Sequence, residues 1–150
     1  MIGEIVPKTG IYNTNLKISK MTNFESKVNL SSDINKVYTF LSDLNNHEKL
    51  MPQNIYNWSS TTDEARFTIQ NMSKLALKVS SRVENQEINI IPAEEAPFAI
   101  EMKWLISQNG IETEAKLIVS AELNMMMKML ASTPLQKLVD HQTASLKDIL

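Results

Sequence analysis

Two histidines are the side chains of this chain whose ordinary pKa lies closest to neutral pH, so acid–base chemistry would start from them. His47 lies in a segment near the middle of the first half, and His141 is flanked by Asp140 and Gln142 near the end of the sequence. If His141 faces inward from a helix, burial lowers its pKa and makes the neutral ring a usable base. A solvated or hydrogen-bonded histidine on a helix surface is the competing interpretation, and it is favoured.

The usual partners of catalytic chemistry are missing from the sequence. The chain has no cysteine and only three glycines, and it contains no HExxH, no GxSxG, no histidine pair at metal spacing and no glycine-rich phosphate loop. Glu101, Glu112 and Glu114 alternate with apolar residues, which predicts that they lie on a solvated sheet surface. The sequence therefore predicts no catalytic residue, no cofactor and no metal site, and it argues against an enzyme without excluding one.

A few small polar residues fall on the predicted inner face. Hydroxyl and amide groups can orient a ligand, but without an activating partner they are weak acids and bases. Hydrogen bonds to neighbouring carbonyl groups explain them equally well. These candidates are Ser26, Ser81, Thr113 and Asn124.

Composition indicates one globular domain. The 150 residues are 43% hydrophobic and 21% charged, values that favour a folded core over disorder. Fifteen basic and seventeen acidic residues give a net charge of -2 without a basic patch, so nucleic acid is not an expected partner. No apolar run reaches the roughly 20 residues of a membrane span. Residues 1–20 lack an uninterrupted apolar stretch, so no targeting segment and a cytoplasmic location are predicted.

The first part of the chain differs from the rest. Residues 1–21 carry Pro7, Gly10 and scattered apolar residues, and they are interpreted as an N-terminal arm or extension. Residues 22–150 are regularly patterned and form the predicted domain. One function hypothesis is a protein-interaction module, in which the arm either adds to a sheet edge of another subunit or clamps the body of its own chain. A homodimer is one partner that this hypothesis allows.

The pattern from residue 24 predicts a strand followed by two short helices. Apolar residues alternate over Phe24–Leu30, as in a half-buried strand. Asp33 and the two serines before it are helix N-cap residues, and apolar residues recur at helical spacing after them. A second helical turn over Leu44–Met51 ends at Pro52, which lacks a backbone donor.

Six further strands and a long helix are predicted beyond Pro52. The strands are expected at 55–59, 65–70, 75–83, 86–91, 98–107 and 111–122, joined by short turns that favour an antiparallel meander. The inner face of the last two is predicted to carry Phe98, Ile100, Met102, Trp104, Ile106, Ile111, Thr113, Ala115, Leu117, Val119 and Ala121.

The C-terminal segment is predicted to cover this apolar face as a helix. Its apolar stripe consists of Met127, Leu130, Leu135, Leu138, Val139, Leu146 and Ile149. Thr133-Pro134 predicts a break or a kink, because proline removes a helical hydrogen bond. The methionine-rich segment before Pro134 would then be a movable lip over an internal space.

These elements resemble the helix-grip fold of the START-like superfamily, also called SRPBCC or polyketide cyclase-like. The resemblance covers residues 22–150 and includes Phe24-Glu25-Ser26-Lys27, the helix Val37 to Asp43, and Leu50-Met51-Pro52 followed by Trp58. It implies an α+β fold, in which a curved seven-stranded antiparallel sheet wraps around a long C-terminal helix, with two short helices between strands one and two. It also implies a tunnel between sheet and helix, often used for lipids, polyketides and other apolar molecules.

The leading function hypothesis is the binding or carrying of a small apolar ligand in this tunnel. A cyclase, dehydratase or isomerase acting on an apolar substrate there is the alternative, with His141 as its candidate base. Methionines and tryptophans near the tunnel can also be ordinary core residues. The predicted lining is Phe98, Met102, Trp104, Leu117, Met127, Leu130, Leu138 and His141.

Removal of residues 1–20 tests the arm hypothesis. If the arm mediates assembly, the truncated chain has a lower molar mass in solution than the full chain. Light scattering at matched concentrations measures this difference, and equal masses contradict a role of the arm in assembly.

Overall fold

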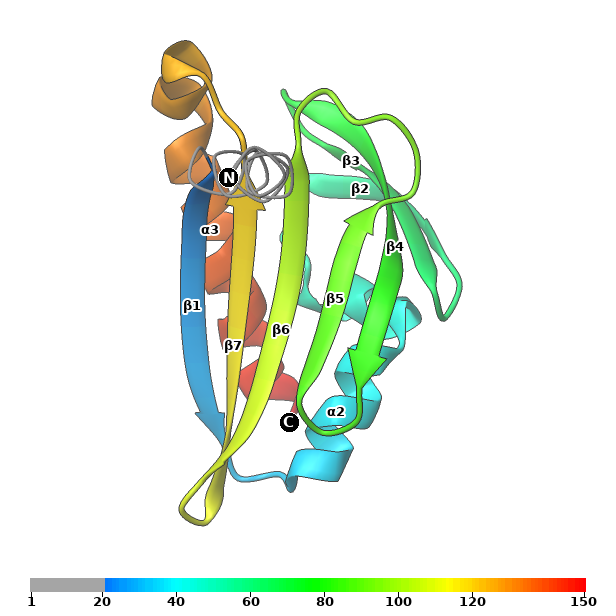
Figure 1. Ribbon diagram of the computed structural model, residues 1–150, viewed down its shortest axis with the longest axis vertical. Helices are drawn as coiled ribbons and strands as arrows, with labels where there is room; N and C mark the ends of the chain where they lie inside the picture. Colours follow the sequence, from blue (N-terminus) through cyan, green and yellow to red (C-terminus); the bar gives the residue numbers. More distant parts are fainter. Residues whose placement is uncertain (1–20) are drawn as a thin grey trace, which may run out of the picture.

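A computed structural model gives the structure of the chain, and residues 21–150 are described. Residues 1–20 of the predicted arm lie outside the described residues. The described chain has the predicted α+β organisation of one strand, two short helices, six strands and a long helix (Figure 1). The elements are β1 (Thr22–Leu30), α2 (Ile34–Ser42), the 3-10 helix η1 (Leu44–Leu50), β2 (Ile55–Ser60), β3 (Glu64–Ile69), β4 (Ser73–Val83), β5 (Glu87–Pro92), β6 (Ile100–Asn109), β7 (Glu112–Ala121) and α3 (Met125–Ile149).

The seven strands form one antiparallel sheet with the order β1-β7-β6-β5-β4-β3-β2. Strands β2 to β7 therefore follow one another as a meander, and β1 closes the far side by pairing with β7. The longest pairing joins β6 to β7, from Ile100 opposite Ala121 to Asn109 opposite Glu112. The sheet curls into a half-barrel, and α3 lies across its concave side (Figure 1).

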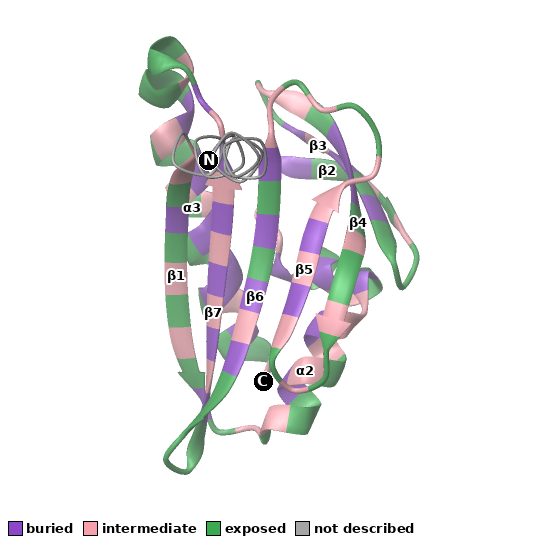
Figure 2. Cartoon of the chain, viewed as in Figure 1, coloured by how far each residue is buried: buried purple, intermediate pink, exposed green. Residues whose placement is uncertain are grey.

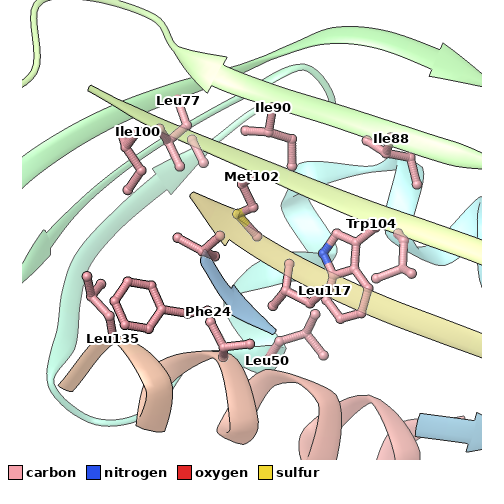
Figure 3. Packing of buried hydrophobic residues seen from close by; sticks show 14 of the residues in the cluster. Phe24, Leu50, Leu77, Ile88, Ile90, Ile100, Met102, Trp104, Leu117 and Leu135 are labelled. Atoms are coloured by element: carbon pink, nitrogen blue, oxygen red, sulfur yellow. The ribbon is translucent and has the colours of Figure 1, made fainter. Parts of the chain in front are cut away.

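Side chains alternate between the core and the outer surface along the central strands. Ile100, Met102 and Trp104 of β6 are buried, whereas Glu101 and Lys103 between them are exposed, an alternation that Figure 2 shows along the strand. The same period of two holds along β7, as expected when one face of a strand is covered. The buried residues pack into one hydrophobic cluster between the sheet and α3 (Figure 3).

Side-chain hydrogen bonds satisfy backbone groups at both ends of α2. The carboxylate of Asp33 accepts a hydrogen bond from the backbone N–H of Lys36 at 2.9 Å, which satisfies a free donor at the helix N-terminus. At the other end, the guanidinium group of Arg82 donates two hydrogen bonds to the carbonyl oxygen of Ser42, at 2.7 and 3.1 Å. Arg82 belongs to β4, so it attaches the end of α2 to the sheet.

The edge strand β1 is covered by α3. Gln136 donates a hydrogen bond to the carbonyl oxygen of Glu25 at 3.0 Å, and Lys147 donates one to that of Asn29 at 3.1 Å. Between them, the hydroxyl groups of Ser26 and Thr143 lie 2.6 Å apart. The helix thus supplies donors to the carbonyl groups of an edge strand, which would otherwise be open to pairing with another chain.

Two predicted inward residues of the last strands lie elsewhere. Ile111 is 96% exposed because it belongs to the turn between β6 and β7, where Gly110 has a φ of 64°. Strand β7 begins one residue later, so the predicted inward position of Ile111 is wrong. Phe98 precedes β6 in the β5–β6 connection and packs partly buried against the core.

Helix α3 continues through Pro134, so the predicted break is wrong. Its first turns project beyond the ends of β1 and β7 (Figure 1). Leu130 in this part is 72% exposed, and Ile149 at the other end is 42% exposed, so neither belongs to the buried stripe. The buried side of α3 consists of Ala131, Leu135, Val139, Gln142, Thr143 and Leu146.

Two isoleucines allow a matched test of this core. Ile88 is fully buried and Ile111 is almost fully exposed. Replacing Ile88 by Ala should lower the free energy of unfolding by about 2–5 kcal/mol, since it leaves a cavity in packed surroundings. The Ile111→Ala control should change it by less than about 0.5 kcal/mol. Urea unfolding at pH 7 measures both, and equal losses would contradict the described positions.

Candidate functional site

An internal cavity lies between the concave side of the sheet, α3 and η1. Its free volume is about 40 Å³, enough for a few water molecules and too small for a lipid without movement of its walls. Of its sixteen lining residues, fourteen are apolar or aromatic. The lining is Leu44, His47, Met51, Trp58, Ala65, Phe67, Ile69, Leu75, Leu77, Ile90, Ile100, Met102, Val119, Leu135, Leu138 and Gln142.

The cavity walls come from most parts of the fold. Strands β2 to β7 supply the sheet side, where Ile100 and Met102 project from β6 toward the layer in which Leu135 of α3 lies (Figure 3). The alternation of each strand sends every second side chain to this side. Residues far apart in the sequence therefore meet at one space that no local segment could form.

His47 is one of the two polar residues that border the cavity. Its side chain is 2% exposed, and Nε2 lies 2.8 Å from the carbonyl oxygen of Leu41. A carbonyl oxygen can only accept, so Nε2 carries the proton and Nδ1 of the neutral ring is an acceptor. Burial lowers the pKa of His47 to about 4, against the smaller opposing effects of the Leu41 hydrogen bond and of Asp43. At pH 7 the ring is therefore neutral and a weak base.

Gln142 is the second polar residue of the lining. It lies on the buried side of α3 and is 1% exposed. Within residues 21–150, its Oε1 atom is buried and has no hydrogen-bond partner. A buried polar atom without a partner is costly, so its presence in an otherwise apolar wall calls for a physical reason.

Three of the lining side chains are partly exposed, and we call this set of residues the mouth of the cavity. It comprises Met51, Trp58 and Leu138. The Trp58 ring stacks on Phe67 with centroids 5.3 Å apart, and its Nε1–H donates to Ser60 Oγ at 2.9 Å. These contacts hold the indole against β3, so Trp58 lies on the cavity side and is not an outer-face residue.

Two of the eight predicted lining residues border this cavity. Met102 approaches from β6 and Leu138 from α3. Trp104 and Leu117 are fully buried, but they belong to the packed core beside the cavity. The pattern of alternating residues identified the correct face of the sheet and did not distinguish packed positions from open ones.

The other four predicted lining residues do not border the cavity. Phe98 and Met127 are partly buried and pack against the edge of the core. Leu130 and His141 are exposed, so the predicted inward positions of these two residues are wrong. His141 precedes the buried Gln142, and one helical residue rotates a side chain by about 100°. The predicted stripe of α3 is correct at Leu135, Val139 and Leu146, which are buried, and wrong at Leu130.

The methionine-rich lip also differs from its prediction. Met125, Met126 and Met129 are exposed by 81%, 71% and 82%, and only Met127 packs against the core. The methionines that border the cavity are Met51 and Met102. Both have flexible, polarizable side chains that can adapt their shape to a ligand.

The small polar residues that the sequence placed on the inner face make hydrogen bonds within the fold. Thr113 donates a hydrogen bond to the carbonyl oxygen of Ser32 at 2.8 Å, and Ser26 bonds Thr143. Asn124 accepts one from the backbone N–H of Met127 at 2.8 Å and caps α3. Ser81 is exposed and accepts one from Asn89 at 2.9 Å.

Among residues 21–150, no group of three or more His, Cys, Asp or Glu side chains is placed to hold a metal ion. The described part of the chain also has no helix with the length and apolar character needed to cross a membrane.

Comparison with known proteins shows the fold. No protein-family model matches the chain, and no curated protein matches its sequence. Solved structures do match. TTHA0849 from Thermus thermophilus is 15% identical with a TM-score of 0.69, over 85% of this chain and 95% of that one.

Two further structures are similar over most of their length. A START superfamily protein from Mycobacterium smegmatis is 18% identical with a TM-score of 0.61, over 85% of this chain and 99% of that one. The Aha1 dimer from Colwellia psychrerythraea is 16% identical with a TM-score of 0.61, over 87% and 96%. The chain therefore has the START-like helix-grip fold that its sequence predicted. The cytoplasmic location and the homodimer remain predictions.

The neutral state of His47 predicts a specific pH dependence of stability. Its pKa is about 4 in the folded chain and about 6.5 when unfolded, so the unfolded chain binds more protons between these values. Stability is then full above pH 6.5 and decreases as the pH falls toward 4. From pH 7 to pH 5 this contribution amounts to about 2 kcal/mol.

The His47→Gln variant tests this origin. Gln can still donate to the Leu41 carbonyl but does not titrate, so the loss of unfolding free energy between pH 7 and pH 5 should shrink by about 2 kcal/mol. Urea titrations at both pH values measure the loss. His141→Gln is the matched control, because it removes an exposed histidine. An unchanged pH dependence in His47→Gln would refute a buried neutral ring.

Proposed function

We propose that this protein binds a small apolar molecule in the cavity between its sheet and α3. The observation that supports the proposal is an internal space whose lining is apolar except for His47 and Gln142. Sites for small molecules are typically concave and apolar, with a few polar groups that orient the ligand. The START-like fold is consistent with this use, since its sheet and helix enclose a space of this kind.

The absence of charge in the lining narrows the type of ligand. No Lys, Arg, Asp or Glu side chain is among the residues around the cavity. A charged group placed there would lose its hydration without gaining a counter-ion, which is strongly unfavourable. The ligand is therefore uncharged in the part that enters.

The volume requires that the walls move when a ligand binds. A free volume of about 40 Å³ is far below the roughly 300 Å³ or more of sites for drug-sized molecules. Met51 and Met102 can change rotamer at low cost, and Met51 is one of the three mouth residues. Binding of a ligand of that size therefore requires these side chains to move apart.

Purification from the native host provides the direct test. Native mass spectrometry should detect a bound mass that disappears on denaturation, and organic extraction should recover an apolar molecule. A protein that is free of any apolar molecule, and that binds no apolar probe afterwards, would contradict the proposal.

A cavity-filling variant tests the location. Ala65 borders the cavity from β3, and replacing it by Leu should raise the Kd for the apolar probe N-phenyl-1-naphthylamine about tenfold, because the new side chain occupies the space. Fluorescence titration at pH 7 measures the Kd. Ala144→Leu adds the same atoms at an exposed position of α3 and should leave the Kd unchanged. Equal effects of the two variants would place the probe elsewhere.

A further inference from the structure

We infer that the cavity selects uncharged apolar molecules that carry a hydrogen-bond donor, most simply a hydroxyl group, for which His47 Nδ1 and Gln142 Oε1 are the acceptors. This inference rests on the proposed function and specifies the chemistry of its ligand. It is carried by two buried polar side chains, contributed by η1 and α3, that border the same apolar space.

His47 presents an acceptor because of its backbone contact. The 2.8 Å bond to the Leu41 carbonyl uses the only proton of the neutral ring on Nε2. The carbonyl cannot donate, so the opposite tautomer would leave two acceptors facing each other. Nδ1 can therefore bind a donor at neutral pH and cannot act as one.

Gln142 presents a second acceptor. Its Oε1 is completely buried, and no residue within 21–150 donates a hydrogen bond to it. Leu146, one helical turn further along α3, is fully buried on the same side, so packing alone does not require a glutamine there. An O–H group entering the cavity would remove the cost of the unpaired oxygen.

The combination discriminates among apolar molecules. A hydrocarbon leaves both acceptors unpaired, and an ether or ketone brings only further acceptors. A carboxylate brings a negative charge to two acceptors without any cation in the lining. A neutral alcohol or phenol supplies the missing proton, and sites that hydrogen-bond a ligand group strongly reject analogues without it.

Four molecules that share a propylphenyl group test this selectivity. They are 4-propylphenol, which donates, 4-propylanisole, which only accepts, propylbenzene, which does neither, and 4-propylbenzoate, which is charged at pH 7. Isothermal titration calorimetry should give 4-propylphenol a Kd about tenfold lower than that of 4-propylanisole or propylbenzene, with 4-propylbenzoate the weakest. Equal affinity for the phenol and the anisole, or tighter binding of the benzoate, overturns the inference while apolar binding itself stands.

The Gln142→Leu variant tests whether the Gln142 side chain causes the preference for 4-propylphenol. Without Oε1 the preference for 4-propylphenol over 4-propylanisole should fall about three- to tenfold. Gln53→Leu removes an exposed amide and should keep the preference of the wild type. A preference that survives in Gln142→Leu overturns the role of Gln142.

The Tm of the ligand-free protein tests, independently of binding, whether Gln142 Oε1 is an unpaired acceptor. Removing an unpaired buried oxygen should raise the Tm of Gln142→Leu by about 2–4 °C. A lower Tm would show that Oε1 is already satisfied, for instance by water, and would overturn the inference. If none of the four molecules binds, the proposed function fails, and the direction of this Tm change still decides whether an unpaired acceptor is present.

Discussion

The structure depends on the covering of a wide apolar sheet face by a single helix. Seven strands spaced about 4.8 Å apart span roughly 29 Å, whereas a helix with its side chains is only about 10–12 Å across. Helix α3 packs along β1 and β7 at one side of the sheet, where its side chains bond the edge strand. The remaining width must be reduced by curvature and filled by other elements.

The helices α2 and η1 and the curl of the sheet provide most of this filling. Arg82 attaches the end of α2 to β4, and the buried residues Leu44 and Leu50 of η1 reach the core. The space that is left lies where η1, α3 and strands β2 to β7 meet. The cavity therefore follows from the geometry of one helix against seven strands, and its lining is apolar because it belongs to the core.

Two polar side chains in this core lower the free energy of unfolding of the protein. Neutral His47 is retained at a cost that grows when the unfolded chain can be protonated, and Gln142 keeps a buried oxygen without a partner in the described chain. Groups of this kind are typical of functional sites. The weak basicity of His47 makes it a poor proton acceptor at pH 7, so its position suits hydrogen bonding of a ligand better than proton transfer.

The sequence by itself determined the class of fold and the order of its elements. Alternation along residues 100–106 and 113–121, the cap at Asp33 and the stop at Pro52 are local signals, because strand pleating and backbone hydrogen bonding act over a few residues. Only the tertiary structure decided that α3 buries Gln142 and exposes His141, and that packing separates Trp104 from the open cavity. Those features depend on contacts between residues about 100 positions apart, and a periodic pattern carries no information about which of its members meet a partner and which meet an open space.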